Sequence, residues 1–348
     1  MNVLITLTVL VFYIVVCDCW NEAISYNHSV FPCEAGCASN APCFPTDWTT
    51  IAETSKALTE KCEYVLYSIA LGNKDTLKVI TIEDFWDGKT CSIFFLSSHS
   101  KFAHIHKLDT GSRFRNWTII GVESSTLDQA FGSNRRAAKV VKMSPHYFLH
   151  PNVKYAIFID AKLQVVANPI DVIKTHMEPY NDVILAALRH PFSTSFSDEF
   201  RTISRIYHVY KNTAITDNFH LLAKQVKAYN ESALMRSDFV QIMIEGGYQA
   251  IKVHDEVSQQ FRCAWLNQVQ QYADRDQVSF PYVLGWMTHG NMLEPGSRNN
   301  SFLSLRDEAT GVGGRRRVNL LNSSVYWWKT EGTRLAKQLT YQELMQFK

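Results

Sequence analysis

The chain has 348 residues, of which 46% are hydrophobic and 20% are charged, and its formal net charge at pH 7 is +2. A chain of this length and apolar content buries a sizeable core, which excludes a largely disordered protein. A charge balance so close to neutral leaves no basic footprint for nucleic acid, so we expect no nucleic-acid partner.

Residues 1–19 have the composition of a targeting segment. Residues 3–16 contain only apolar side chains and two threonines, and the first charged side chain is Asp18. This length suits the core of a cleaved signal peptide better than a full membrane span, which takes about 20 residues. A short uncleaved anchor is the alternative, because thin secretory membranes tolerate short spans. In either case we expect the rest of the chain in the lumen of the endoplasmic reticulum or Golgi, membrane-anchored or secreted.

Glycosylation sequons and cysteines favour the same compartment. Five sequons occur, at Asn27, Asn116, Asn230, Asn299 and Asn322. Six cysteines follow the leader, at positions 33, 37, 43, 62, 91 and 263. An even number of cysteines in an oxidising compartment predicts disulfides, although their connectivity is not given by spacing. A zinc site at the first three is disfavoured because the paired C-x-x-C spacing is missing.

The pattern of the chain changes near residue 60. Residues 20–60 contain cysteine, proline and asparagine without periodicity and are predicted to form a stem or a disulfide-stapled N-terminal extension. Residues 61–285 alternate short apolar runs with amphipathic stretches. Continuous apolar runs are typical of strands buried on both faces of a mostly parallel sheet covered by helices. They span residues 64–70, 92–96, 117–122, 155–159 and 183–188.

Helical patterns lie between and after these runs. Residues 134–143 are rich in Ala, Lys and Arg and stop before Pro145. Apolar residues recur at helical spacing in residues 198–210, in residues 218–229 and around Trp265. Strands alternating with helices predict one main α/β domain. Residues 286–348 are predicted to form a C-terminal extension with a terminal helix near residues 333–347.

Several common catalytic motifs are absent from the sequence. There is no phosphate-binding G-x-x-x-x-G-K-[ST] loop, no G-x-S-x-G elbow, no H-E-x-x-H and no G-x-G-x-x-G. This argues against the common NTPases, serine hydrolases, zinc proteases and dinucleotide-dependent enzymes.

The strongest local feature is Asp160, which directly follows the apolar run 155–159. A carboxylate at the carboxyl end of a parallel strand lies in the crevice where α/β sheets bind ligands. It can bind a hard cation that in turn holds a diphosphate. Lys162 stands where a second aspartate of an Asp-x-Asp pair would stand, and its ammonium can neutralise a diphosphate directly. A cap of the turn after the strand is the structural alternative for Asp160.

A second feature follows the helix that contains Trp265. Asp274 and Asp276 flank Arg275 there, and Gln277 comes next. Carboxylates in such a group can orient sugar hydroxyls or take part in acid–base chemistry. A solvated cluster that caps a helix, with an aspartate–arginine pair, is the structural alternative.

Histidines and one further arginine complete the candidates. His146 and His150 are four residues apart, but Pro145 and Pro151 interrupt a helix there, so structural roles are favoured over metal ligation. Arg189 and His190 follow the apolar run 183–188 and either face the crevice of Asp160 or pair with surface carboxylates.

These features occur in a fixed order along the chain. They are Pro145-His146, Ile159-Asp160-Ala161-Lys162-Leu163-Gln164, Arg189-His190-Pro191 and Arg275-Asp276-Gln277-Val278-Ser279-Phe280. The ordered set resembles the family of plant mucilage-related hexosyltransferases and their relatives, whose glycosyltransferase-like domain was long classed as of unknown function. The resemblance covers roughly residues 60–285. Ala161 replaces the usual glycine, and residues 232–260 match the family pattern poorly, so the acceptor is not carried over. Lys162 is shared with the family.

The resemblance implies a Rossmann-like fold of the GT-A type and the transfer of a hexosyl unit from a nucleotide sugar to a glycan or glycoconjugate. Asp160 is then expected to hold the donor, through a divalent cation (Mn²⁺ or Mg²⁺) or a sugar hydroxyl. Because Lys162 can neutralise phosphate, the cation is optional. Asp276 is the candidate for acceptor activation or sugar positioning. Further expected substrate contacts are Arg136, Lys139, Arg189, His190, Arg275, Gln277 and Trp265, the last either stacked on a sugar or part of the core.

Two other functions remain open on the sequence. One is a catalytically inactive glycan-binding protein of the same fold. The other is a hydrolase that uses Asp160 and Asp276 as a carboxylate pair, for which the separation of the two carboxyl groups is informative.

Overall fold

The computed structural model describes residues 46–72, 88–123, 133–161, 164–165, 168–179, 183–190, 193, 195–216, 218–232, 243–289 and 336–337. The leader, residues 20–45, Lys162 and nearly all of the C-terminal extension lie outside these residues. The predictions made for them therefore stay predictions.

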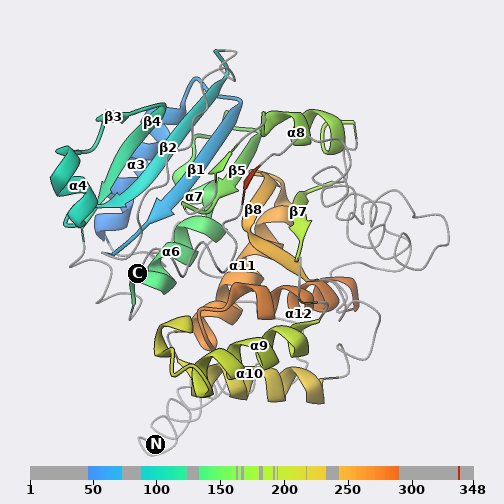
Figure 1. Cartoon of the computed structure of the whole chain (residues 1–348). Helices are drawn as coiled ribbons and strands as arrows, with labels where there is room; N and C mark the ends of the chain where they lie inside the picture. The colour runs from blue at the N-terminus through green and yellow to red at the C-terminus, as the bar shows by residue number, and fades with distance from the viewer. Residues whose placement is uncertain are drawn as a thin grey trace, which may run out of the picture. The chain divides into compact units, whose positions relative to one another are not determined.

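Seven strands form one mixed sheet in the order β3-β4-β2-β1-β5-β8-β7 (Figure 1). Their bounds are β1 Tyr64–Ala70, β2 Thr90–Ser97, β3 Arg113–Phe114, β4 Trp117–Val122, β5 Tyr155–Ile159, β7 Leu185–Arg189 and β8 Ile244–Lys252. Strands β4, β2, β1 and β5 are parallel, whereas β8 is antiparallel to both of its neighbours and β3 is antiparallel to β4. The predicted mostly parallel sheet is confirmed.

The strands form where the sequence is continuously apolar. All seven residues of β1 are buried, and β1, β4 and β5 coincide with the predicted runs. Strand β8 was not predicted, because its sequence IEGGYQAIK mixes two glycines with polar residues. It is nevertheless buried along almost its whole length, since it lies between β5 and β7.

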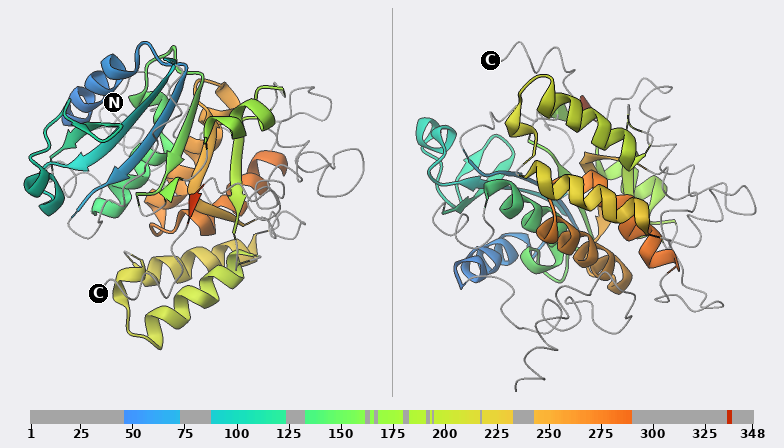
Figure 2. Two further views of the ribbon diagram at one scale, coloured as in Figure 1. Left: turned by 45° about the horizontal axis from the view of Figure 1, so that its top comes forward. Right: turned by 90° about the horizontal axis from the view of Figure 1, so that it is seen from below.

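The helices cover both faces of the sheet (Figure 2). Their bounds are α3 Thr46–Thr59, α4 Lys101–His106, α6 Asn134–Met143, α7 Pro145–Phe148, α8 Ile170–His176, α9 Phe196–His208, α10 Phe219–Glu231, α11 Glu256–Gln271 and α12 Asp276–His289, with a 3₁₀ turn, η1, at Thr213–Ile215. Helices α4 and α8 share one core cluster with alternate residues of β1 and β5, among them Leu66 and Ile157. On the opposite face, Phe95 of β2 packs against Phe148 of α7, which in turn contacts Trp48 of α3.

Side-chain caps explain where several helices begin. Ser133, Ser195, Asn218 and Asp255 each accept a hydrogen bond from the backbone N–H three residues later. Such caps satisfy donors that the helix itself leaves unpaired. Helices α9 and α10 pack side by side, and α9 also contacts α12, so these three helices form a layer next to the sheet (Figure 1).

Three expectations about local structure need correction. Residues 46–59 of the predicted stem form α3, which packs on α7 and β4 and so belongs to the folded domain. Pro145 begins the short helix α7 instead of interrupting one. Proline is tolerated at the first helical position, because the backbone N–H there has no partner within the helix and is not missed. Residues 336–337 form strand β9, paired with β6 (Gln164–Val165), where a terminal helix was expected.

One disulfide joins Cys62, just before β1, to Cys91 in β2, and Cys263 is also disulfide-bonded. This confirms that the chain carries disulfides. Among the residues that the structure describes, no helix is both long and apolar enough to cross a membrane.

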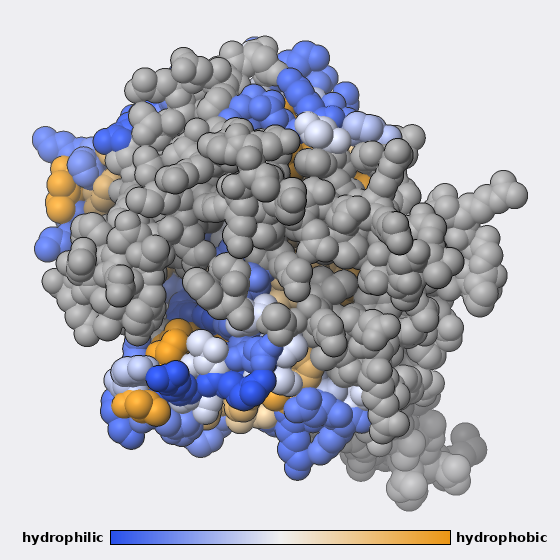
Figure 3. Space-filling view, turned by 45° about the vertical axis from the view of Figure 1, so that its right-hand side comes forward, coloured by the Kyte–Doolittle hydropathy of each residue, from blue (hydrophilic) through white to orange (hydrophobic). Residues whose placement is uncertain are grey.

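Exposed apolar side chains are scattered over the described surface. The large ones are Leu58, Ile105, Val209 and Tyr210, which lie on or just after three different helices. On the face drawn in Figure 3, apolar residues of the described part likewise lie singly among hydrophilic ones. An extended apolar docking face is therefore not evident on this part of the chain.

Candidate active site

The ends of strands β5 and β7 meet the start of β8 at the carboxyl end of the parallel strands. Asp160 directly follows β5, and its backbone N–H donates to the carbonyl of Gly247 in β8 at 2.7 Å. Because β8 runs antiparallel to β5 and β7, its first residues lie at the end of the sheet where those two strands finish. The backbone N–H of His190, just after β7, donates to the Met243 carbonyl at 2.8 Å. This is the edge where open α/β sheets bind ligands.

Asp160 itself is partly exposed at this edge. Its charge also acts on the buried Lys142 of α6, whose ammonium it helps to keep protonated. Asp160 therefore lies between solvent and a buried charged network, as expected of a ligand-binding carboxylate at the end of a strand.

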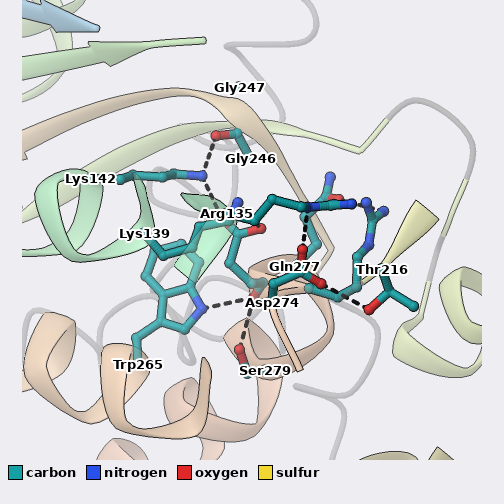
Figure 4. A network of polar contacts seen from close by, with 12 residues as sticks. Arg135, Lys139, Lys142, Thr216, Gly246, Gly247, Trp265, Asp274, Gln277 and Ser279 are labelled. Carbon is teal, nitrogen blue, oxygen red and sulfur yellow. Dashed lines mark hydrogen bonds and ion pairs between the residues drawn. The ribbon is translucent and has the colours of Figure 1, made fainter. Parts of the chain in front are cut away.

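Asp276, the first residue of α12, lies at the centre of that network. One carboxylate oxygen is 2.9 Å from the Lys139 Nζ, and the other accepts a hydrogen bond from the Lys142 Nζ. Asp276 has only 4% of its surface exposed. Its backbone carbonyl accepts hydrogen bonds from Trp265 Nε1 at 2.7 Å and from Ser279 Oγ at 3.0 Å. Figure 4 shows the Trp265 indole and Ser279 on the α11–α12 side and Lys142 on the opposite side of this group.

The charges of Asp276 and Lys142 depend on each other. Burial raises the pKa of Asp276, but the ammonium groups of Lys139 and Lys142 outweigh it and hold the pKa well below its usual range. Burial also lowers the pKa of Lys142, to about 8, although Asp276 opposes that shift. At neutral pH the site therefore holds an ionised carboxylate between two ammonium groups.

A second charged group joins Arg275 to helix α9. The Arg275 guanidinium hydrogen-bonds the buried carboxylate of Glu199, which also accepts from Ser193 Oγ at 2.8 Å. His190 Nε2 lies 3.7 Å from the same carboxylate, while His190 Nδ1 accepts from the Ser193 backbone N–H at 2.7 Å. The Nδ1 atom is therefore unprotonated. Burial raises the pKa of Glu199, but Arg275 and its other partners lower it overall.

The two aspartates of the Asp274–Arg275–Asp276 turn thus pair with basic residues of α6, whereas Arg275 pairs with Glu199 of α9. Asp274 binds Arg135 of α6 and accepts from Thr216 Oγ1 at 2.8 Å. Gln277 donates to the Ile244 carbonyl of β8 at 3.2 Å. The solvated aspartate–arginine cluster, our structural alternative for this segment, is not what the structure contains, because both aspartates are buried and pair with α6, and Arg275 pairs with Glu199.

Two predicted substrate contacts have other roles in this structure. The guanidinium of Arg136 donates to the carbonyls of Gln270 and Tyr272, at 2.6 and 2.5 Å, and so caps the end of α11. Trp265 is 1% exposed and packs against Phe261 and Phe280. Of the two alternatives for Trp265, stacking on a sugar or packing in the core, the structure shows the second, because neither face of the ring is open to a sugar.

The remaining candidates are placed as follows. His190, Arg275, Gln277 and Lys139 come together with Asp276 around the start of α12 and β8. The backbone of Arg189 ends β7, whereas its side chain is outside the described residues, as is all of Lys162. Within the described part of the chain, no group of three or more His, Cys, Asp or Glu side chains is arranged to hold a metal ion. Both oxygens of Asp276 are engaged by lysines, so this carboxylate is not placed to bind a cation.

Sequence reasoning missed Lys142, Glu199 and Gly246. Lys142 was visible only as a basic residue at the end of a helix, and Glu199 only as an acidic residue in the first turn of another. Neither position carries a signal that it is buried, because burial here depends on contacts with residues at least 76 positions away.

The chain was then compared with known proteins. Residues 31–303 match the family described as TOD1/MUCI70, glycosyltransferase-like domain. This match spans most of the chain, so the chain belongs to that family, and the resemblance found in its motifs is confirmed.

Two relatives come from Arabidopsis thaliana. One, named a probable hexosyltransferase MUCI70, is 26% identical over 180 residues, which cover 51% of this chain and 29% of the relative. The other, named alkaline ceramidase TOD1, is 24% identical over 319 residues, which cover 86% of this chain and 63% of the relative. The chain thus spans less than two thirds of the length of either relative.

Two solved structures are similar at a lower level. Mouse xyloside xylosyltransferase 1 has 10% identity and a TM-score of 0.36, covering 66% of this chain and 82% of that one. The bifunctional glycosyltransferase WbbM has 9% identity and a TM-score of 0.33, covering 68% and 36%. Both TM-scores are below 0.5, so these likenesses do not establish a shared fold.

Proposed function

We propose that this member of the TOD1/MUCI70 family is a hexosyltransferase of the GT-A type, which moves a hexosyl unit from a nucleotide sugar to a glycan or glycoconjugate. The proposal places it in the lumen of the secretory pathway, in the Golgi or endoplasmic reticulum, held or released by its N-terminal segment. The observation that carries the proposal is the position of Asp160. It is a partly exposed carboxylate at the carboxyl end of a central parallel strand, beside a buried lysine–aspartate network.

In this proposal Asp160 binds the donor, through a sugar hydroxyl or with a divalent cation, and Lys162 neutralises diphosphate charge. Lys139 has 22% of its side chain exposed and faces Asp276, so it lies at the border between the buried network and the site. Negative charge on the leaving diphosphate increases as the sugar–phosphate bond breaks. Fixed ammonium groups next to that position stabilise the developing charge.

Of the two roles predicted for Asp276, acceptor activation and sugar positioning, acceptor activation is disfavoured. A general base works best when its pKa is near the operating pH. The pKa of Asp276 is held far below that by two lysines, so its carboxylate binds a proton too weakly to deprotonate an acceptor hydroxyl. The hydrolase that uses Asp160 and Asp276 as its carboxylate pair is disfavoured by geometry, because Asp276 is 4% exposed and both its oxygens are held by lysines, which leaves neither oxygen free to attack a substrate.

A hydrolase of another design remains the second candidate, since one relative bears the name alkaline ceramidase. A glycan-binding protein without turnover is the third. The three differ in the reaction that they carry out. A transferase consumes the nucleotide sugar to completion only when an acceptor is present. A ceramide hydrolase releases a fatty acid from ceramide, and a binding protein does neither.

The test uses the purified full chain with a panel of nucleoside diphosphate hexoses, glycan acceptors and, separately, ceramide. Release of nucleoside diphosphate and the mass of the acceptor are followed with and without Mn²⁺ or Mg²⁺. We expect turnover of at least one donor, and an Asp160→Asn variant that loses about 100-fold or more in kcat/KM. Asp109→Asn, at an exposed aspartate in the turn after α4, is the matched control. The assignment of Asp160 is wrong if both variants turn over the donor as well as the wild type does, and the transferase proposal fails if no donor is bound.

A further inference from the structure

Lys142 is a buried charge that no part of the proposed donor chemistry uses. It lies in the last turn of α6, and its side chain is 4% exposed, whereas lysines are almost never fully buried without a partner. The side chain enters the core next to aromatic rings, with the Nζ atom 4.9 Å from the ring centre of Phe158 and 5.9 Å from that of Trp265. A charge in such surroundings is retained only where its contacts compensate its lost hydration.

Those contacts join three separate parts of the chain. The Lys142 ammonium donates to the carboxylate of Asp276 in α12 and, at 2.6 Å, to the carbonyl of Gly246 in β8. In Figure 4 it extends from α6 directly to Gly246. The next residue, Gly247, accepts the hydrogen bond from the backbone of Asp160. A continuous path of two hydrogen bonds and one peptide unit therefore leads from Lys142 to the backbone of the proposed donor-binding residue.

The space at Gly246 fits this arrangement closely. A Cβ atom added there would lie 3.2 Å from the Lys142 Nζ, 3.3 Å from the Gln277 Cγ and 3.4 Å from an oxygen of Asp276. The first two distances are tighter than ordinary van der Waals contact, so a larger residue there would push the ammonium or Gln277 back by a few tenths of an ångström. Glycine thus permits both Lys142 and Asp276 to reach the strand.

We propose that Lys142 is a positioning residue of the donor site, which fixes the Gly246–Gly247 segment of β8 against Asp276 and thereby holds the backbone of Asp160 in place. The proposal deepens the proposed transferase function and rests on it for its catalytic consequence. Lys142 does not touch the donor; it acts through Gly246 and Asp276. Misplacing a reacting group by about 1 Å can cost about 100-fold in rate, so a residue of this kind matters without contacting substrate.

The test compares Lys142→Met, which keeps the length of the side chain and removes the ammonium, with Lys154→Met. Lys154 is exposed just before β5, at the other end of that strand, and its ammonium lies 3.4 Å from a carboxylate oxygen of Glu63. Two quantities are measured for each folded variant. One is kcat and KM for the donor, and the other is the rate of hydrogen exchange at the Asp160 amide, relative to amides in the middle of β5.

For Lys142→Met we expect a fall in kcat/KM of about 100-fold, together with faster exchange at the Asp160 amide and unchanged exchange in the middle of β5. Lys154→Met should change neither quantity. Because Lys142 acts through Asp276, the double variant Lys142→Met/Asp276→Asn should be no worse in kcat/KM than the worse single variant. A purely structural lysine would instead accelerate exchange throughout the strand and give additive losses.

The outcomes separate this proposal from the proposed function. If the wild type turns over no donor, the function fails, while the exchange rate at Asp160 still decides whether Lys142 holds the segment. If Lys142→Met leaves both kcat/KM and the Asp160 exchange rate unchanged, the positioning role is overturned. If Lys142→Met does not fold, Gly246→Ala decides in its place, since it keeps every charge and crowds the ammonium together with Gln277 and Asp276. Unchanged exchange at Asp160 in that variant overturns the proposal as well.

Discussion

Asp276→Asn is the perturbation that most directly probes the buried charge network. Asp276 is 4% exposed, and its two oxygens bond to Lys139 and Lys142. Removing its charge affects the two lysines differently. Lys139 has 22% of its side chain exposed and can turn toward water, whereas Lys142, at 4%, is left with the Gly246 carbonyl and only the weaker attraction of Asp160.

The expected cost follows from this difference. Breaking a buried ion pair by removing one partner destabilises a protein by about 3–5 kcal/mol, because the other charge stays buried and uncompensated. The asparagine oxygen still accepts one hydrogen bond, so we expect the lower end, about 3 kcal/mol. That is a large part of the 5–15 kcal/mol that stabilises a typical domain. The variant should therefore fold but unfold at clearly lower denaturant concentration.

The assay is urea unfolding at pH 7, followed by tryptophan fluorescence, with Asp109→Asn as the exposed control. The control should stay within about 0.5 kcal/mol of the wild type, as surface substitutions usually do. A loss below about 1 kcal/mol in Asp276→Asn would refute the reasoning, since it would mean that Lys142 is not held as a buried cation by this carboxylate.

Three further predictions use the same measurement of the free energy of unfolding. Glu199→Gln should cost about 2–3 kcal/mol, because the partly buried Arg275 guanidinium loses the buried carboxylate that it bonds to; equal stability would show that this ion pair does not stabilise the fold. Replacing Cys62 and Cys91 together by serine should cost about 3–4 kcal/mol, the chain-entropy value for a loop closed over 29 residues, and no loss under oxidising conditions would contradict it. The third concerns pH. Burial lowers the pKa of Lys142 from 10.5 to about 8, so between these values the unfolded chain binds more protons than the folded one. The stability of the wild type relative to Lys142→Met should therefore rise as pH increases from 8 toward 10.5, and a fall over that range would contradict the assignment.

The fold was largely predictable because burial on both faces leaves a clear mark on the sequence. Strands β1, β4 and β5 and helix α6 coincide with their predicted ranges, since continuous apolar runs and a following proline define them locally. Strand β8 escaped prediction because two of its residues are glycines, one of which, Gly246, lies against Lys142, which is a tertiary demand. Helix α3 escaped because its amphipathic pattern is weak and it is held by contacts with α7 and β4.

The site was predictable in its members but not in their pairing. Asp160 and Asp276 were found from their positions after apolar segments, and both lie at the same end of the sheet. Which charges oppose them depends on long-range packing, so Lys142 and Glu199 went unnoticed. The long-range contacts also bear on the role proposed for Asp276, because a carboxylate between two lysines is a poor base. Trp265 changed for the same kind of reason, since only the packed structure shows that both faces of its ring are covered.

Donor turnover by Asp160→Asn compared with the wild type and with Asp109→Asn is the measurement that tests the central claim most directly. Kinetics are measured on folded protein with the best hexose donor from the panel and its acceptor. The account predicts transfer by the wild type and the control, with a loss of about 100-fold or more in kcat/KM for Asp160→Asn. Equal kcat/KM for all three proteins would contradict the claim that the carboxylate at the end of β5 binds the donor.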